Sequence, residues 1–169
     1  MKFLILFLIL IGGILIYDLY PGNKIPANAI VDKIVVLKSE RKLLAYANGT
    51  ILIAYKISLG KNPIGVKQYE GDKKTPEGIY YINNKTAISK FHKNLGISYP
   101  NENDLKNAKQ IGNPAGGSIK IHGLQNGLGF IGRLQTLSDW TAGCIALTNE
   151  EVDDLYNHTP MGTVIEIKP

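Results

Sequence analysis

The sequence predicts a mainly β, single-domain protein that follows an apolar N-terminal segment. Three observations carry this prediction. The chain is rich in turn formers, with 18 Gly and 8 Pro in 169 residues. Short apolar runs lie between these turn residues, and an Asn48-Gly49 pair separates two of the runs, which is a strong hairpin signal. We expect a β-sandwich or a partly closed barrel with one or two short helices.

The N-terminal segment begins with Met-Lys and continues as an unbroken apolar run over residues 3–17. A positive start and an apolar run are typical of an export signal, although a comfortable membrane span needs ~20 apolar residues. The small-x-small pattern of a cleavage site occurs at 27–29, far beyond the run. We therefore expect an uncleaved signal anchor over residues 1–20 and a linker over 21–30, with a cleaved signal as the alternative.

The remaining residues, 31–169, form the expected domain. An anchor with its positive charge before the apolar run keeps that end in the cytoplasm, so we expect residues 31–169 on the periplasmic side of the inner membrane. The formal charge of +5 is modest and no dense Lys/Arg cluster occurs, so the sequence does not indicate a nucleic-acid partner.

The expected strands cover residues 34–37, 43–47, 51–57, 79–82, 118–122 and 163–167. A short helix is expected over 103–110, starting from an Asn cap. Thr148 and Glu151 have the spacing of a capping box, which predicts a second helix that ends near residue 156. The segment 85–100 shows no clear period, and 123–132 contains four glycines and is expected to be a loop.

Cys144 is the only cysteine. In an exported chain it cannot form an internal disulfide, so it is a buried filler, an intermolecular partner or a reactive thiol. Gly143 precedes it, which allows a sharp turn and the close approach of a substrate. Amides around such a turn can also point at a developing oxyanion.

A thiol with a pKa of ~8.5 needs a base to become a nucleophile at neutral pH. Of three histidines, His122 ends an expected strand, His92 lies in the segment without a period, and His158 follows the last helix. We favour His122 as the base, with a half-buried structural histidine as the alternative. One Cys and three scattered His lack metal-ligand spacing, so neither a metal nor another cofactor is expected.

Four sequence motifs resemble those of the L,D-transpeptidase catalytic-domain (YkuD-type) family. Ile121-His122-Gly123 is followed, after about twenty residues, by Thr141-Ala142-Gly143-Cys144-Ile145, and the family motif is HG, a spacer, S/T-x-G-C and an apolar residue. The longer runs 139–149 and 97–101 are similar to the YafK-like branch, and 75–78 matches the TPxG turn of the family. The resemblance extends over most of residues 33–168.

The resemblance implies an L,D-transpeptidase-like antiparallel β-sandwich that acts on the stem peptides of peptidoglycan. It implies that Cys144 attacks the carbonyl of the third stem residue, the L-centre of diaminopimelate, and that His122 moves the proton. The Gly123 carbonyl would orient His122, and the Gly143 and Cys144 amides would form the oxyanion hole. Candidate substrate-binding residues are His92, Tyr99, Arg133, Trp140 and Thr141.

One departure concerns the residue two positions after the cysteine, which is Arg in many family members and Ala146 here. An Arg can hold a carboxylate through two hydrogen bonds, so its absence puts the usual substrate contacts in question.

Three functions remain open at this point. A transferase would pass the thioester to an amine of another stem peptide or of a lipoprotein lysine. A hydrolase would pass it to water, as an L,D-carboxypeptidase or as an amidase that releases a wall-linked lipoprotein. A non-catalytic murein-binding domain would keep only the fold.

Overall fold

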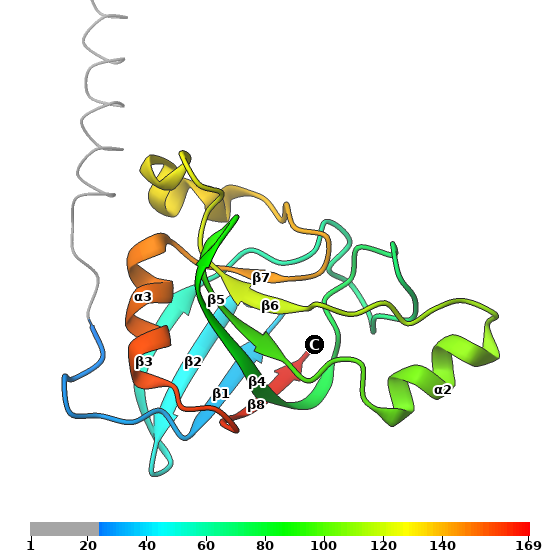
Figure 1. The fold of residues 1–169 in the computed structure, drawn as a ribbon, viewed down its shortest axis with the longest axis horizontal. Coiled ribbons are helices and arrows are strands. Elements are labelled where there is room, and N and C mark those ends of the chain that lie inside the picture. Colours follow the sequence, from blue (N-terminus) through cyan, green and yellow to red (C-terminus); the bar gives the residue numbers. More distant parts are fainter. Residues whose placement is uncertain (1–23) are drawn as a thin grey trace, which may run out of the picture.

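The computed structural model describes residues 24–169, so the expected anchor over residues 1–20 lies outside the described residues. Eight strands form one sheet in the order β3-β2-β1-β8-β4-β5-β6-β7 (Figure 1). The strands are β1 (Lys33–Leu37), β2 (Lys42–Ala47), β3 (Thr50–Lys56), β4 (Gly78–Ser89), β5 (His92–Ile97), β6 (Lys120–His122), β7 (Ile145–Ala146) and β8 (Val164–Lys168).

The sheet is mixed, which corrects the antiparallel arrangement expected from the sequence. β1 pairs with β8 in parallel, as β6 does with β7, and the other pairs are antiparallel. Both parallel pairs join strands that are not connected by a tight turn. Hydrophobic alternation reports the two faces of a strand and not the direction of its partner, so the sequence pattern could not reveal these pairs.

The predicted hairpin at Asn48-Gly49 is confirmed. Both residues have positive φ, 50° and 76°, as a two-residue hairpin turn of the primed type requires. β2 and β3 flank the turn and pair in antiparallel fashion. Their inward side chains, among them Leu43 and Ile53, join the hydrophobic core.

The largest error of the sequence analysis lies in residues 79–97. β4 is much longer than expected, and β5 occupies part of the segment that shows no period. The first part of β4 pairs with β8 and the second with β5, so this strand joins the two halves of the sheet. Most of its second half is exposed or half-buried, which removes the alternation that would have revealed it.

Three short helices accompany the sheet, where one or two were expected. They are α2 (Glu102–Gln110), the 3-10 helix η1 (Gly129–Leu137) and α3 (Asn149–His158). The capping box that opens α3 is confirmed, with both of its hydrogen bonds present. η1 was missed because the glycines of its segment indicate a loop.

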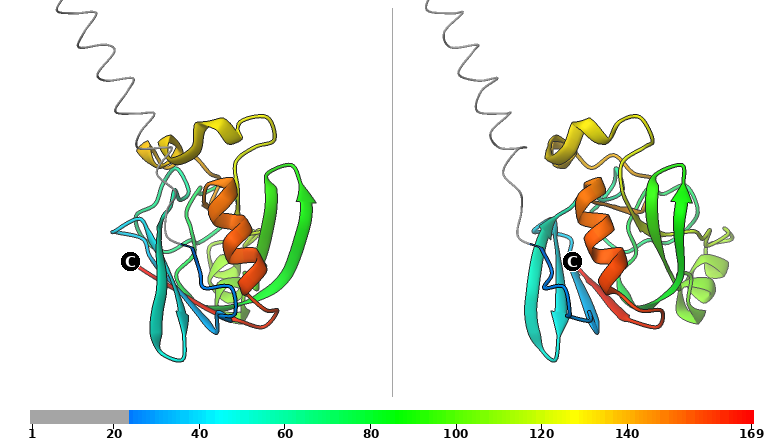
Figure 2. Two further views of the ribbon diagram at one scale, coloured as in Figure 1. Left: turned by 90° about the vertical axis from the view of Figure 1, so that its left-hand side faces the viewer. Right: turned by 60° about the vertical axis from the view of Figure 1, so that its left-hand side comes forward.

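α3 connects the two halves of the sheet through the core. Its buried Val152 and Leu155 belong to the same hydrophobic cluster as Ile34 of β1 and Leu95 of β5. Figure 2 shows α3 between the β1–β3 half and the β4–β5 half. This position brings the N-terminal end of α3 close to the end of β6, where Gly123 packs against Asn149 and Val152.

The described part of the expected linker lies against the domain. The Ile25 side chain is buried, and its backbone N–H donates to Asp154 of α3 at 2.9 Å. None of the helices within residues 24–169 is long and apolar enough to cross a membrane.

Candidate functional site

His122 ends β6 and is 6% exposed. Its Nδ1 lies 2.7 Å from the backbone oxygen of Gly123. A carbonyl oxygen only accepts, so Nδ1 carries the hydrogen and Nε2 is left with its lone pair. Burial lowers the pKa of the imidazole, against the raising effect of the Gly123 carbonyl. The histidine is therefore a neutral base at neutral pH.

Two aromatic side chains enclose the His122 ring. The Phe91 ring lies 4.8 Å from it and the Trp140 ring 5.7 Å, between ring centroids. The Trp140 indole N–H donates to Gln135, whose side-chain amide donates to the backbone of Ala146. These contacts restrict the orientation of the imidazole and limit its access to water. The sequence analysis named Trp140 but missed Phe91, which lies in the segment without a period.

Cys144 lies directly before β7, which runs parallel to β6 with His122 opposite Ala146. Ile145 faces the core. Because side chains alternate along an extended chain, Cys144 faces the same side of the sheet as Ala146 and His122. The expected nucleophile, directly before β7, and the expected base, at the end of β6, are thus diagonal neighbours.

The thiol is protonated at rest. Burial raises the pKa of Cys144, while a hydrogen bond from the backbone of Lys120 and the charges of Lys120 and Lys67 act in the opposite direction and only in part offset it. The Sγ–H donates to the Ser118 backbone oxygen at 3.7 Å. Both shifts favour a neutral thiol beside a neutral imidazole over a preformed ion pair.

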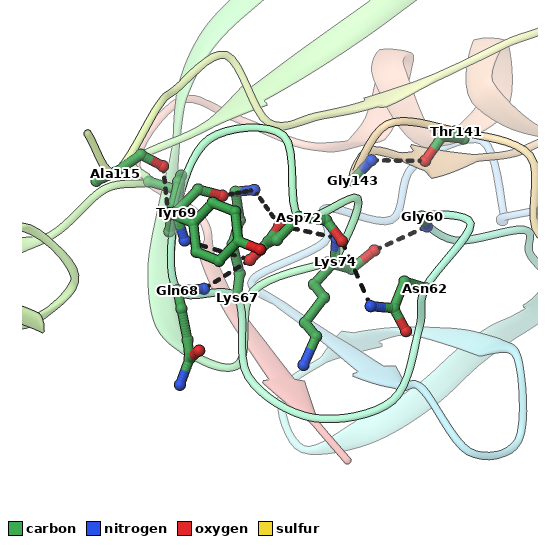
Figure 3. A network of polar contacts seen from close by, with 12 residues as sticks. Gly60, Asn62, Lys67, Gln68, Tyr69, Asp72, Lys74, Ala115, Thr141 and Gly143 are labelled. Atoms are coloured by element: carbon green, nitrogen blue, oxygen red, sulfur yellow. Dashed lines mark hydrogen bonds and ion pairs between the residues drawn. The ribbon is translucent and has the colours of Figure 1, made fainter. Parts of the chain in front are cut away.

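The turn before Cys144 depends on Gly143. Its φ is 134°, and a Cβ at this position would lie 2.7 Å from the Lys74 backbone oxygen. The Thr141 hydroxyl accepts from the Gly143 N–H at 3.1 Å and donates to the Cys144 backbone oxygen at 2.7 Å. Figure 3 shows the Thr141–Gly143 contact. The Gly143 amide, an expected oxyanion donor, is therefore already bonded, whereas the Cys144 N–H has no acceptor within residues 24–169.

The loop that contains Lys74 is fastened by an ion pair that the sequence analysis missed. Lys67 and Asp72 lie 2.7 Å apart, and their side chains are 4% and 3% exposed. The Asp72 carboxylate also accepts from the backbone N–H groups of Gln68, Tyr69 and Lys74 (Figure 3). This network holds the Lys74 carbonyl against Gly143. The only signal in the sequence was the Gly71-Asp72 turn.

The TPxG turn joins the same region to the sheet. The buried Thr75 hydroxyl accepts from the Gly60 N–H at 3.1 Å. The buried Lys38 ammonium donates to the Thr75 backbone oxygen and to Glu77. The motif is therefore placed as a support of the turn before Cys144.

Two of the candidate substrate-binding residues pair with carboxylates of α3. The His92 Nε2 lies 2.8 Å from Asp153, and the Arg133 Nε lies 4.0 Å from Glu151. The His92 Cβ would contact a side chain at position 123, so His92 adjoins the catalytic strand while its ring is turned to the helix.

Tyr99 lies in the core. It is 5% exposed, packs edge-on against Tyr80 and donates from its hydroxyl to Ala115. Burial raises its pKa, as do the nearby charges of Asp104 and Asp72. These contacts do not bring it to His122 or Cys144.

Within residues 24–169, no three His, Cys, Asp or Glu side chains gather in a way that could hold a metal ion.

Comparisons with known proteins identify the family and the fold. The model of the L,D-transpeptidase catalytic domain (YkuD) matches residues 31–167. YafK of Escherichia coli (strain K12), whose name makes it a candidate L,D-transpeptidase, is 29% identical over 129 residues, which cover 73% of this chain and 45% of YafK.

Solved structures of similar fold include the helical cell shape determining protein Pgp2 of Campylobacter jejuni, with a TM-score of 0.62 and 26% identity over 89% of this chain and 51% of Pgp2. Bd1075 of Bdellovibrio bacteriovorus, at 23% identity, shares the fold with a TM-score of 0.58 over 87% of this chain and 51% of its own. The chain spans about half the length of these relatives. The family model matches residues 31–167, which is most of the chain, and the chain therefore belongs to the L,D-transpeptidase catalytic domain family.

Proposed function

We propose that this protein forms a thioester between Cys144 and a peptidoglycan stem peptide and passes it to an amine, which is L,D-transpeptidation in cell-wall remodelling. The observation that carries the proposal is the pair of a buried, neutral His122 and the Cys144 thiol on one face of β6 and β7. The Gly123 carbonyl holds the imidazole in the tautomer whose Nε2 accepts a proton. Membership of the family supplies the class of reaction.

Acylation follows from the protonation states. As the sulfur attacks the carbonyl carbon of the third stem residue, its proton passes to the His122 Nε2. The tetrahedral intermediate collapses when the peptide C–N bond breaks and the imidazolium protonates the departing amine. The Gly123 carbonyl stabilises the imidazolium through Nδ1. Because the resting pair is neutral, proton transfer accompanies the attack and does not precede it.

The developing oxyanion needs N–H donors close to Cys144. We assign this role first to the Cys144 N–H, because the Gly143 N–H already bonds the Thr141 hydroxyl. Loss of one such donor typically costs 10²–10³-fold in kcat. Thr141 then acts by fixing the turn, through its two hydrogen bonds to Gly143 and Cys144.

Deacylation regenerates the thiol. An incoming amine gives up a proton to His122 and forms a new amide, or water does the same and releases an acid. Both routes use the same two side chains, so hydrolysis is the alternative function. Only the product distinguishes the hydrolase from the transferase.

The test is mass spectrometry of muropeptides incubated with the full chain in detergent. New crosslinks or exchanged terminal residues support the transferase, and shortened or released stems support the hydrolase. Cys144→Ala is expected to abolish either product, while His158→Ala, which alters a histidine bonded to the Asp154 backbone of α3, is the matched control. Turnover by Cys144→Ala would contradict the nucleophile assignment, and unchanged muropeptides would favour a binding domain.

We also propose that the domain works on the periplasmic side of the cell envelope, anchored in the inner membrane by residues 3–20, with a wall-linked lipoprotein as one acceptor. The apolar run over 3–17 and the location of peptidoglycan support this placement. Fractionation of cells that express the full chain tests it, since recovery of the protein in the cytosolic fraction would contradict it.

A further inference from the structure

We propose that Lys120 is a specificity-determining residue that binds a carboxylate of the peptide substrate next to Cys144. This inference deepens the proposed function, because it rests on a peptide as the substrate. Nothing in the sequence analysis singled out this lysine.

The position of Lys120 on β6 carries the first step. Its neighbours Ile119 and Ile121 are buried in the core, 4% and 0% exposed. Side chains alternate along a strand, so Lys120 and His122 share the opposite face. The register of β6 and β7 pairs Ile121 with Ile145, so Cys144 lies opposite Lys120 one residue earlier and faces the same side. The lysine stem therefore begins directly beside the nucleophile.

The charge of the Lys120 ammonium reaches both reacting groups. It lowers the pKa of the Cys144 thiol and also that of the His122 imidazole. Lys67 is the other cation whose charge reaches the thiol, but it is buried and paired with Asp72 at 2.7 Å. Lys120 has no carboxylate within 4.0 Å in the part of the chain that the structure describes. The half-buried Lys120 therefore has no anion paired with it in the described residues.

An anion brought to this place gains a charge-assisted hydrogen bond at a partly water-excluded site. A stem peptide offers two carboxylates near the bond that Cys144 would attack. One is the C-terminal carboxylate of the residue that is expelled, and the other is the free carboxylate at the second centre of diaminopimelate. Lysine is a compact point charge on a flexible stem, so its reach permits either one.

The experiment measures how much peptide is needed to protect Cys144 of the full chain from iodoacetamide, followed by mass spectrometry. Three synthetic stem peptides serve as probes: one with all carboxylates free, one with a C-terminal amide and one with the diaminopimelate carboxylate amidated. The variants are Lys120→Met, Lys120→Arg and, as a control with the same charge change on the exposed face of α2, Lys106→Met. The protecting concentration, and not the alkylation rate, is compared, because the charge of Lys120 itself affects the thiol.

Lys120→Met is expected to raise the protecting concentration of the free peptide about 10–100-fold, with Lys120→Arg restoring most of it and Lys106→Met leaving it unchanged. One amidated peptide should protect wild-type protein poorly and should protect Lys120→Met equally poorly. The carboxylate that this peptide lacks is the one that Lys120 binds. Equal protection of wild type and Lys120→Met, or no loss with either amide, overturns the proposal. Failure of every peptide to protect wild-type protein overturns it as well.

The two proposals fail in different ways. If the free peptide protects Cys144 through Lys120 but no thioester or product forms, the proposed acyl transfer is wrong and the carboxylate site stands. If wild-type protein turns the peptide over and Lys120→Met has the same KM and kcat, the acyl transfer stands and the carboxylate site is wrong.

Discussion

Replacing Asp72 with Asn is expected to lower the free energy of unfolding by about 3–5 kcal/mol, the cost of breaking a buried ion pair by removing one partner. The Asp72 carboxylate accepts from Lys67 at 2.7 Å and from the backbone of Gln68 at 2.7 Å, Lys74 at 3.0 Å and Tyr69 at 3.2 Å. An Asn would leave the Lys67 ammonium buried without a counter-charge. Its NH₂ group would also face an N–H donor or the ammonium.

The pH dependence supplies a second readout. Burial raises the pKa of Asp72, but the hydrogen bonds from Lys67 and from the backbone outweigh it, so the net pKa is lowered. A lowered folded-state pKa means that the stabilisation is complete above the unfolded value of ~3.9 and is lost as pH falls through the folded value. Wild-type protein should therefore lose stability below pH ~4 more steeply than Asp72→Asn.

The assay is urea unfolding followed by Trp140 fluorescence, at pH 7 and below pH ~4. Glu40→Gln is the control, because it breaks the ion pair with Lys42 whose side chains are 50% and 49% exposed, and such exposed pairs contribute ~0–1 kcal/mol. Replacing both Lys67 and Asp72, with Met and Asn, should cost less than Asp72→Asn alone. A loss no larger than that of Glu40→Gln would refute the reasoning.

Four further outcomes are expected. His122→Ala should reduce turnover about 10²-fold or more. Because burial raises the thiol pKa, alkylation of Cys144 in wild-type protein by iodoacetamide should reach half its maximal rate above pH ~8.5. A midpoint at or below that pH would contradict this. Gly143→Ala should lose ~1–3 kcal/mol more than Gly49→Ala, since both have positive φ but only a Cβ at 143 meets the Lys74 oxygen, at 2.7 Å; equal urea midpoints would count against it. Leu155→Ala, at a side chain with no exposure, should cost about 2–5 kcal/mol in the same assay, and a loss below ~1 kcal/mol would show that α3 does not hold the two halves of the sheet together.

The site residues that the sequence analysis named share one property: their chemistry is visible in the residue type and its close neighbours. A lone Cys144 after Gly143 and a histidine before Gly123 stand out in any fold. The hairpin at Asn48-Gly49 and the Thr148 cap are equally local, because positive φ and helix capping depend on a few consecutive residues. Local chemistry also explains why the motifs of the YkuD family are visible in the sequence.

The missed residues lie in segments that show no periodic pattern. Phe91 contacts His122 from the turn between β4 and β5, and Lys67 meets Asp72 in a loop with no periodic pattern. β5 was missed because its first two residues are half-buried and the second half of β4, which pairs with it, is exposed or half-buried. The parallel pairs were missed because strand direction leaves no trace in hydrophobic alternation.

The sequence by itself determined the family, the mainly β class and the identity of the thiol and imidazole. Only the tertiary structure decided that the thiol and the imidazole face the same side of the sheet, that burial raises the pKa of the thiol and lowers that of the imidazole, and that the Gly143 amide is bonded to Thr141. The physical reason is that protonation and orientation depend on burial and on partners distant in the chain, which folding alone brings together.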